Sequence, residues 1–236
     1  MDIKILKPRL PAGLAREQVF SMMDCREDSP VYEDVVIEYD RLEPWLYENV
    51  RPEALMAMEP LEVLDARQKK CLGLTDGEAL SCRGLLYLVL TIGRGPEQKS
   101  SELFAQGEYL AGMLLSAMAD EFVFGLEDGV LPEVRAFLAG PGYGVLRRLE
   151  APADMPLKFH QYVYERCGLK QRLGMDLSSG YMFDPVKTSC LVFLLSDDPS
   201  VFHGWHDCSR CPAADCPRRR QERALGTVLQ AEPLQA

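Results

Sequence analysis

The sequence predicts an α+β fold in which helices pack around a twisted antiparallel sheet. The run "GLLYLVLTIG" (84–93) is apolar and bounded by glycines, which is typical of a strand buried on both faces. Residues 100–127 carry apolar side chains mostly at three- and four-residue spacing, which is typical of a long core helix. The segment "GMDLSSGYMFDPVKTSCLVFLLSDD" (174–198) predicts two strands joined by a turn through Asp184 and Pro185. This order of elements is that of an α+β domain.

The remaining elements follow from the same patterns. Helices are expected at residues 14–24, 133–138 and 155–168. Residues 35–40 fit either a short strand or a helix, and residues 53–72 mix helix formers around Pro60. The glycine-rich stretch "AGPGYG" (139–144) predicts an irregular turn.

Length and composition indicate one sizeable core, since the chain has 236 residues of which 47% are hydrophobic. We expect an N-terminal helical region (1–80) packed on the main domain. The α+β core would span residues 81–200, and a cysteine-rich tail would span residues 201–236.

Charge and hydropathy exclude several classes of protein. A formal net charge of −10 argues against binding to nucleic acid or to an acidic membrane, because phosphate binding depends on clustered Lys and Arg. No apolar run reaches the roughly 18 residues of a membrane span. The first residues, "MDIKILKPRLPAG", lack the long apolar region of a secretory signal. We therefore expect a cytoplasmic protein.

The cysteines fall into two groups. Five are dispersed in mostly apolar contexts, where reduced thiols are expected: Cys25, Cys71, Cys82, Cys167 and Cys190. The other three, Cys208, Cys211 and Cys216, stand at C-x2-C-x4-C spacing in "HDCSRCPAADC" (206–216). Closely spaced thiolates are soft ligands, so this cluster predicts a metal site.

The fourth ligand and the metal stay open. His206 or His203 would complete a zinc site of three thiolates and one imidazole. Cys190 or Cys167 would instead complete an all-thiolate site for zinc or for an iron–sulfur cluster, although the spacing matches no standard cluster motif. The alternative is a loop without metal, in which the cysteines are reduced or paired as a disulfide.

Other polar residues give no catalytic pattern. The acidic residues in "DEFVFGLEDG" (120–129) are interpreted as solvated helix positions, and His160 as a surface or boundary residue of an amphipathic helix. The sequence contains no nucleophile–base arrangement, no phosphate-binding loop before a lysine and no HExxH motif.

Three segments in order, "YLVLTIGRGPEQKSSELFAQGEYLAGMLLSAMADEF", "GPGYG" and "GYMFDPVKTSC", resemble the activation domain of cobalamin-dependent methionine synthase. The likeness is strongest to the stand-alone relatives of that domain in anaerobic bacteria, and it runs from about residue 84 to 195. It implies an activation-domain fold that binds S-adenosylmethionine, docks on a cobalamin domain and allows reductive methylation of inactive Co(II).

The resemblance also implies a ligand site. It would place S-adenosylmethionine against Pro141, Gly142 and Tyr143, with Tyr181 facing it and Glu121 nearby. An aromatic face can stack on adenine or attract the sulfonium, glycine permits close backbone approach, and a carboxylate balances positive charge.

Two positions near that site depart from the family pattern. The family usually carries an arginine five residues before the loop tyrosine, which is suited to binding a carboxylate. Leu138 occupies that position here, with Arg135 about one helical turn earlier. Gly180 replaces the usual first serine of the hairpin.

The functional prediction is an activation or reactivation protein for a corrinoid-dependent methyltransferase such as methionine synthase. Its partners would be a corrinoid-binding protein and a reductant such as flavodoxin or ferredoxin. The alternative is a non-catalytic interaction module that binds zinc or an iron–sulfur cluster and has lost the S-adenosylmethionine site.

Overall fold

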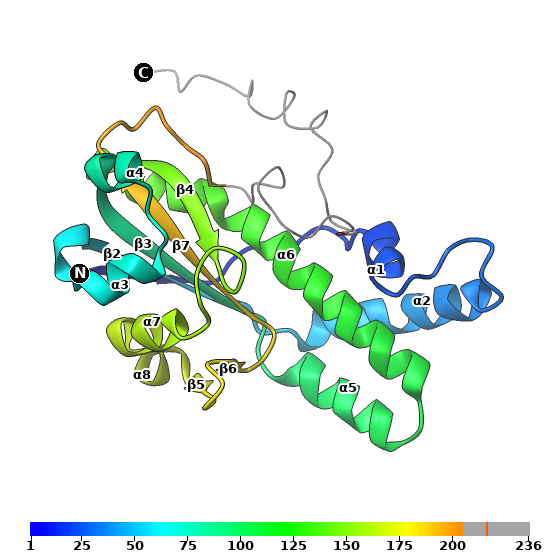
Figure 1. Cartoon of the computed structure of the whole chain (residues 1–236). Coiled ribbons are helices and arrows are strands. Elements are labelled where there is room, and N and C mark those ends of the chain that lie inside the picture. The colour runs from blue at the N-terminus through cyan, green and yellow to red at the C-terminus, as the bar shows by residue number, and fades with distance from the viewer. Residues whose placement is uncertain (205–215, 217–236) are drawn as a thin grey trace.

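A five-stranded antiparallel sheet organises the protein (Figure 1). The computed structural model describes residues 1–204 and 216. The strand order is β1-β2-β3-β7-β4, and a second sheet pairs β5 with β6. The strands are β1 (Asp2–Leu6), β2 (Glu53–Pro60), β3 (Cys82–Thr91), β4 (Gly144–Glu150), β5 (Asp176–Leu177), β6 (Phe183–Asp184) and β7 (Thr188–Ser196). The predicted α+β class with an antiparallel sheet is confirmed.

Helices cover both faces of the sheet and extend past one end of it (Figure 1). They are α1 (Arg16–Met22), α2 (Tyr32–Asn49), η1 (Leu61–Val63), α3 (Ala66–Cys71), α4 (Asp76–Ser81), α5 (Gly95–Ala105), α6 (Tyr109–Ala139), α7 (Phe159–Cys167) and α8 (Leu169–Leu173). The C-terminal half of α6 packs on one face, and α7 and α8 pack on the other. The N-terminal half of α6 joins α1, α2 and α5 in a helical layer beyond the sheet.

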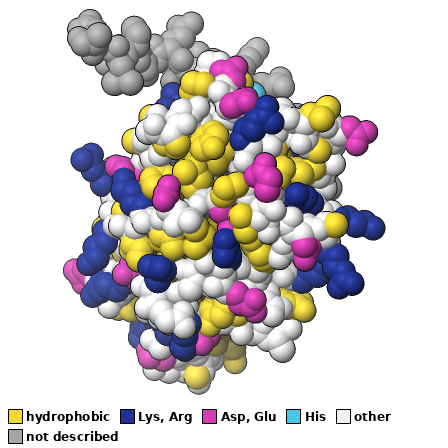
Figure 2. Space-filling model, turned by 90° about the vertical axis from the view of Figure 1, so that its left-hand side faces the viewer, with side chains coloured by type: hydrophobic (Ala, Val, Ile, Leu, Met, Phe, Trp, Pro, Cys, Tyr) yellow, Lys and Arg dark blue, Asp and Glu magenta, His cyan; other side chains and the backbone are white. Residues whose placement is uncertain are grey.

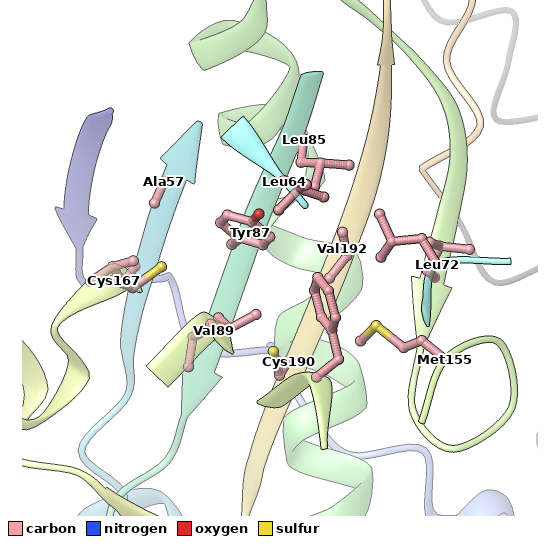
Figure 3. Close-up of a cluster of buried hydrophobic side chains, with 14 of the residues drawn as sticks. Ala57, Leu64, Leu72, Leu85, Tyr87, Val89, Met155, Cys167, Cys190 and Val192 are labelled. Carbon is pink, nitrogen blue, oxygen red and sulfur yellow. The ribbon is translucent and has the colours of Figure 1, made fainter. Parts of the chain in front are cut away.

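Strand β3 is buried on both faces, as its continuous apolar run predicts. Leu85, Tyr87 and Val89 point into the cluster shown in Figure 3, on the α7 side. The alternate residues Leu86 and Leu88 pack under α6. Each face of the central strand therefore has its own core.

Residues 53–60 form a strand, although their helix formers pointed to a helix. The strand lies between β1 and β3, and its alternate side chains enter the two cores, so tertiary packing overrides local propensity. The region 1–80 thus contributes two strands to the sheet, which continues across the expected boundary at residue 80.

The predicted helix at 100–127 is two helices. Helix α5 ends at Ala105, and Gly107, with φ of +83°, turns the chain into α6. Helix α6 continues through Pro132 to Ala139, so the short helix expected at 133–138 is its last part. Residues 35–40 are helical, within α2.

Among the residues that the structure describes, α6 is the one helix long and apolar enough to cross a membrane. More than half of its most apolar window, 56%, is buried inside the protein, and Glu121 and Glu127 are buried along it. This is the pattern of a core helix. The face drawn in Figure 2 carries interspersed basic and acidic side chains.

Candidate functional site

The segment Pro141–Tyr143 terminates helix α6. The backbone N–H of Tyr143 donates to the carbonyl of Leu138 at 3.0 Å, and that of Gly142 donates to Ala139 at 3.1 Å. Gly142 has φ of +74°, in the left-handed region that favours glycine. These two bonds and this conformation define a Schellman motif. The half-buried Tyr143 ring packs on the core cluster that contains Leu138, as this motif commonly requires.

The chain after β7 returns to this end of the sheet. Gly144 allows the close approach, because a Cβ there would lie 2.0 Å from the carbonyl oxygen of Asp198. Val145 donates to the carbonyl of Val201 at 2.8 Å, and His203 donates to the carbonyl of Val145 at 2.9 Å. Residues 198–204 therefore run beside β4.

Arg135 lies next to this segment. The carbon atom at the centre of its guanidinium group is 4.4 Å from the ring centroid of Phe202, and Phe202 packs on the same core as Tyr143. Stacking on Phe202 holds the planar guanidinium group of Arg135 in place and leaves its N–H edge able to bind a carboxylate. Leu138, in contrast, is 1% exposed and offers no donor.

Tyr181 lies at the opposite end of the sheet from Tyr143. It occupies the turn between β5 and β6, just before the N-terminal end of β7, with φ of +65°. Gly144 pairs instead with Ser196 at the C-terminal end of β7. The nine residues of β7 span eight steps of about 3.4 Å, which puts its two ends about 27 Å apart. The structure does not bring the two tyrosines together, because β7 separates them.

Glu121 is buried in the middle of α6, with 5% exposure. The helix ends at Ala139, and at a rise of 1.5 Å per residue this end is about 27 Å from Glu121. It is therefore remote from the Pro141–Tyr143 turn. Glu121 and Glu127 also correct the interpretation of residues 120–129 as solvated, since both carboxylates lie inside the packed face of α6.

A cleft of about 330 Å³ opens between α6, the N-terminal end of β7 and the turn at Tyr181. Strand β4 pairs with β7 only as far as Glu150, opposite Leu191, and Pro152 then prevents further strand pairing. The cleft lies beside the part of β7 that β4 leaves uncovered. Its lining residues are Asp120, Val123, Phe124, Glu127, Glu150, Ala151, Pro152, Leu157, His160, Met182, Val186, Lys187, Thr188, Ser189, Cys190 and Leu191.

Two charge networks line this cleft. The ammonium of Lys187 donates to Asp120 at 2.7 Å and to the hydroxyl and carbonyl of Ser116. The Arg148 guanidinium donates to Glu127 at 2.6 Å and to Glu150 at 3.1 Å. Burial raises the pKa of Glu127, although Arg148 opposes that change.

His160 is buried, with 8% exposure, rather than lying on the surface. Its Nδ1 is 2.9 Å from the carbonyl oxygen of Tyr181. A carbonyl can only accept, so Nδ1 carries the proton and Nε2 keeps its lone pair. Burial lowers the pKa of His160, partly offset by this hydrogen bond, and the ring is neutral at pH 7.

The predicted metal ligands His206, Cys208 and Cys211 lie outside the described residues. Cys216 is half-buried with a free thiol. Within residues 1–204 and 216, no group of three or more His, Cys, Asp or Glu side chains could hold a metal ion. Burial raises the pKa of the Cys167 thiol to about 12 and raises that of Cys190, which disfavours the thiolate that a metal needs. These two cysteines belong to the core (Figure 3).

The cleft could not be predicted from the sequence, because its lining residues come from three stretches of the chain that are far apart, 120–127, 150–160 and 182–191. Glu127 and Arg148 are 21 positions apart on a helix and a strand, and Lys187 is 67 positions from Asp120. The signal that was present is Glu127, a carboxylate within the apolar stripe of α6.

Comparison of the sequence with protein-family models and with curated proteins gives no match. Among solved structures, the chain is similar to the crystal structure of the MetH reactivation domain bound to AdoHcy. The TM-score is 0.55 at 12% identity, and the likeness covers 84% of this chain and 79% of that chain. At this identity it concerns the fold alone, so the chain has the fold of a MetH reactivation domain.

Proposed function

We propose that this chain is a reactivation-domain-like accessory protein, which binds S-adenosylmethionine and docks on a corrinoid protein whose cobalt has become inactive. The observation that carries the proposal is the fold shared over 84% of the chain with a reactivation domain bound to AdoHcy. The methyl-transfer chemistry would belong to the cofactors, and this chain would supply binding and orientation. A reductant such as flavodoxin or ferredoxin would supply the electron.

The proposed ligand surface is the end of α6 formed by Arg135, Gly142 and Tyr143. Arg135, stacked on Phe202, is suited to bind the amino-acid carboxylate in place of the buried Leu138. Tyr143 is half-buried and offers an aromatic face. No neighbouring atom lies within 4 Å of the position that a Cβ on Gly142 would occupy, so a ligand can approach the backbone there. Glu121 and Tyr181 are left out of this site, because the fold holds them at a distance from it.

Calorimetric titration with S-adenosylmethionine tests the ligand half of the proposal. Arg135→Gln should weaken binding about tenfold to a hundredfold, since it removes a charge-assisted hydrogen bond. Arg26→Gln is the matched control, because Arg26 is 77% exposed between α1 and α2. No detectable binding by the unaltered protein at millimolar ligand would overturn S-adenosylmethionine as the ligand.

Size-exclusion chromatography with a purified cobalamin-dependent methionine synthase core tests the docking half. We expect co-elution that is stronger when the cobalt is Co(II), together with a change in the corrinoid visible spectrum. Absence of a complex in every oxidation state would exclude docking on this partner, whatever the result for S-adenosylmethionine.

The alternative function is an interaction module that binds metal and lacks the S-adenosylmethionine site. It is favoured by the Schellman motif, which accounts for Pro141–Tyr143 without any ligand, and by the buried Leu138. A stable corrinoid-protein complex without S-adenosylmethionine binding would favour this alternative.

A further inference from the structure

A groove of about 300 Å³ lies where the end of α1 meets α5 and α6, and it shares only Asp120 with the cleft beside β7. Apolar side chains dominate its lining, which consists of Met22, Met23, Phe104, Met113, Ser116, Ala117 and Asp120. Methionine side chains are flexible and polarisable, and surfaces rich in them accept aliphatic side chains of varied shape. The groove therefore suits a segment of chain that carries aliphatic side chains.

The described part of the chain leaves this groove open. Met113 is 53% exposed and Phe104 is 39% exposed, and the ring centroid of the exposed Tyr109 lies 6.4 Å from that of Phe104. Gly112 permits this arrangement, because a Cβ there would lie 3.1 Å from the Phe104 ring. Adjoining exposed apolar side chains of this kind mark a surface that another segment or partner covers.

The helical layer that holds the groove carries most of the net negative charge. Residues 14–50, which include α1 and α2, contain ten acidic residues and three basic ones, whereas the formal net charge of the whole chain is −10. Asp120 lines the groove, and the exposed Asp24 follows directly after Met23. Charge complementarity therefore favours a segment with Arg or Lys beside its aliphatic side chains.

Residues 217–236, which lie outside the described residues, have such a sequence, PRRRQERALGTVLQAEPLQA. Four arginines stand within residues 218–223. Leu225, Val228 and Leu229 follow at three- and four-residue spacing, which is the spacing of side chains on one face of a helix. A basic amphipathic segment is the kind of ligand that an apolar groove binds by accepting its apolar anchors.

The length of the chain allows the same molecule to supply this segment. A Cβ on Gly204 would lie 3.3 Å from the Leu131 side chain, so the described chain leaves the sheet beside α6. Met113 precedes Leu131 by 18 residues, or about 27 Å along that helix. The 21 residues from Gly204 to Leu225 can span up to about 70 Å. A tethered segment has an effective concentration in the millimolar range, so a Kd of about 0.1 mM suffices to keep it bound.

We infer that this groove binds residues 217–236 of the same chain, with Leu225, Val228 and Leu229 against the groove methionines and the arginines of residues 218–223 facing the acidic surface of α1 and α2. This interaction does not depend on the proposed S-adenosylmethionine site, because the groove contains none of the residues assigned to that site.

NMR spectra of the full chain, labelled at its methionine methyl groups, test the inference. The double variant Leu225→Asp with Leu229→Asp should release the segment, because both changes place a charge on its apolar face. The methyl resonances of the three groove methionines should then shift, while those of the buried Met56 and Met155 should stay in place. Unchanged resonances of the groove methionines would overturn the inference.

The matched control is Thr227→Asp with Gln230→Asp, which adds the same charge on the opposite face of the helical pattern. Its groove methionines should keep the resonances of the unaltered chain, and shifts equal to those of the first variant would contradict the assigned face. Replacement of the four arginines by glutamine should move the same resonances part of the way toward those of the released state. An unchanged spectrum in that variant would reject the role of charge.

Tryptic cleavage after Arg223 tests the groove side, because a bound segment is cleaved only while it is released. Met113→Gln removes an exposed apolar contact and should speed this cleavage about fivefold. Leu80→Gln is the control, since Leu80 is a 78% exposed apolar residue on α4, and it should leave the rate unchanged. Equal cleavage rates in the two variants would overturn the groove as the binding site.

Light scattering and dilution decide which copy supplies the segment. A monomer whose methionine resonances are the same between about 20 and about 200 μM protein supports binding within one chain. A dimer, or release of the segment on dilution, would assign the segment to a second copy and overturn the inference as stated.

Discussion

The guanidinium group of Arg148 on β4 lies 2.6 Å from the carboxylate of Glu127 on α6, and these side chains are 5% and 6% exposed. This buried ion pair joins the longest helix to the edge strand of the main sheet. Glu150 accepts a second bond from the same guanidinium at 3.1 Å. The stability of this ion pair depends on Arg148, because without the guanidinium the charge of Glu127 would be buried without compensation.

Arg148→Met should destabilise the protein by about 3–5 kcal/mol, since it leaves Glu127 uncompensated in the interior. The double variant Arg148→Met with Glu127→Leu should recover most of that loss, because it removes both buried charges. Urea unfolding followed by circular dichroism measures both values. Lys4→Met is the control, since the Lys4–Glu133 pair is exposed and should change stability by less than about 1 kcal/mol. A double variant no more stable than Arg148→Met would contradict this account.

Gly142→Ala should destabilise the protein by about 1–2 kcal/mol, because alanine is strained at φ of +74°. Gly140→Ala is a matched control two residues earlier. Gly140 has φ of −57° in the right-handed helical region and has open space around its Cβ position, so alanine should be neutral or slightly stabilising there. Equal unfolding midpoints for the two variants would argue against the Schellman motif.

Local patterns predicted those parts of the fold that local forces determine. The continuous apolar run predicts the buried strand β3, and the three- and four-residue spacing of apolar side chains predicts a helix in the region of α6. The glycines of "AGPGYG" predict the turn that follows α6. The strand at Glu53–Pro60 was missed, because its residues favour a helix until β1 and β3 lie on either side.

The candidate sites were predicted less well than the fold. Tyr143 and Tyr181 are both aromatic residues in turns, and nothing in their spacing shows that β7 holds them apart. The cleft depends on β4 being shorter than β7, which only the sheet register reveals. Glycine-rich turns are also ambiguous in the sequence, because a helix cap and a ligand-binding loop both use a glycine in the left-handed backbone conformation.

Glu59 should make stability depend on acid pH. Burial disfavours its charge, but hydrogen bonds from Tyr87 and Tyr162, each 2.7 Å long, and from Arg166 lower the pKa of Glu59 overall. Its stabilising contribution is therefore complete above the ordinary value of 4.5 and is lost as the pH falls through the lower pKa of the folded state.

Glu59→Gln should accordingly be less stable than the unaltered protein by about 1–3 kcal/mol at neutral pH. The difference should shrink as the pH falls below 4.5. Urea midpoints measured across this range give the comparison, with the exposed Glu133→Gln as control. A difference independent of pH would show that the charge of Glu59 contributes nothing.

The cysteine-rich tail should carry a metal if its three thiolates act together. Anaerobic purification followed by metal and sulfide analysis distinguishes the two candidates: zinc without colour, or iron and sulfide with a broad visible band. Cys208→Ser and Cys211→Ser should abolish the metal, whereas Cys71→Ser, a half-buried cysteine of the main domain, should retain it. A metal-free protein with unaltered folding would reject the site.

His160 should reduce stability at mildly acid pH. Burial lowers the pKa of His160 below 6.5, so the folded protein resists a proton that the unfolded chain accepts. Stability is therefore unaffected above 6.5 and declines as the pH falls from that value to the lower pKa of the folded state. His160→Gln, which keeps a donor for the Tyr181 carbonyl, should show a smaller fall in urea midpoint between about pH 7.5 and about pH 5.5. An identical fall in both proteins would assign the pH dependence to other groups. Glu127 is not among them, because a carboxyl group whose pKa is raised in the folded state makes the protein more stable as the pH falls.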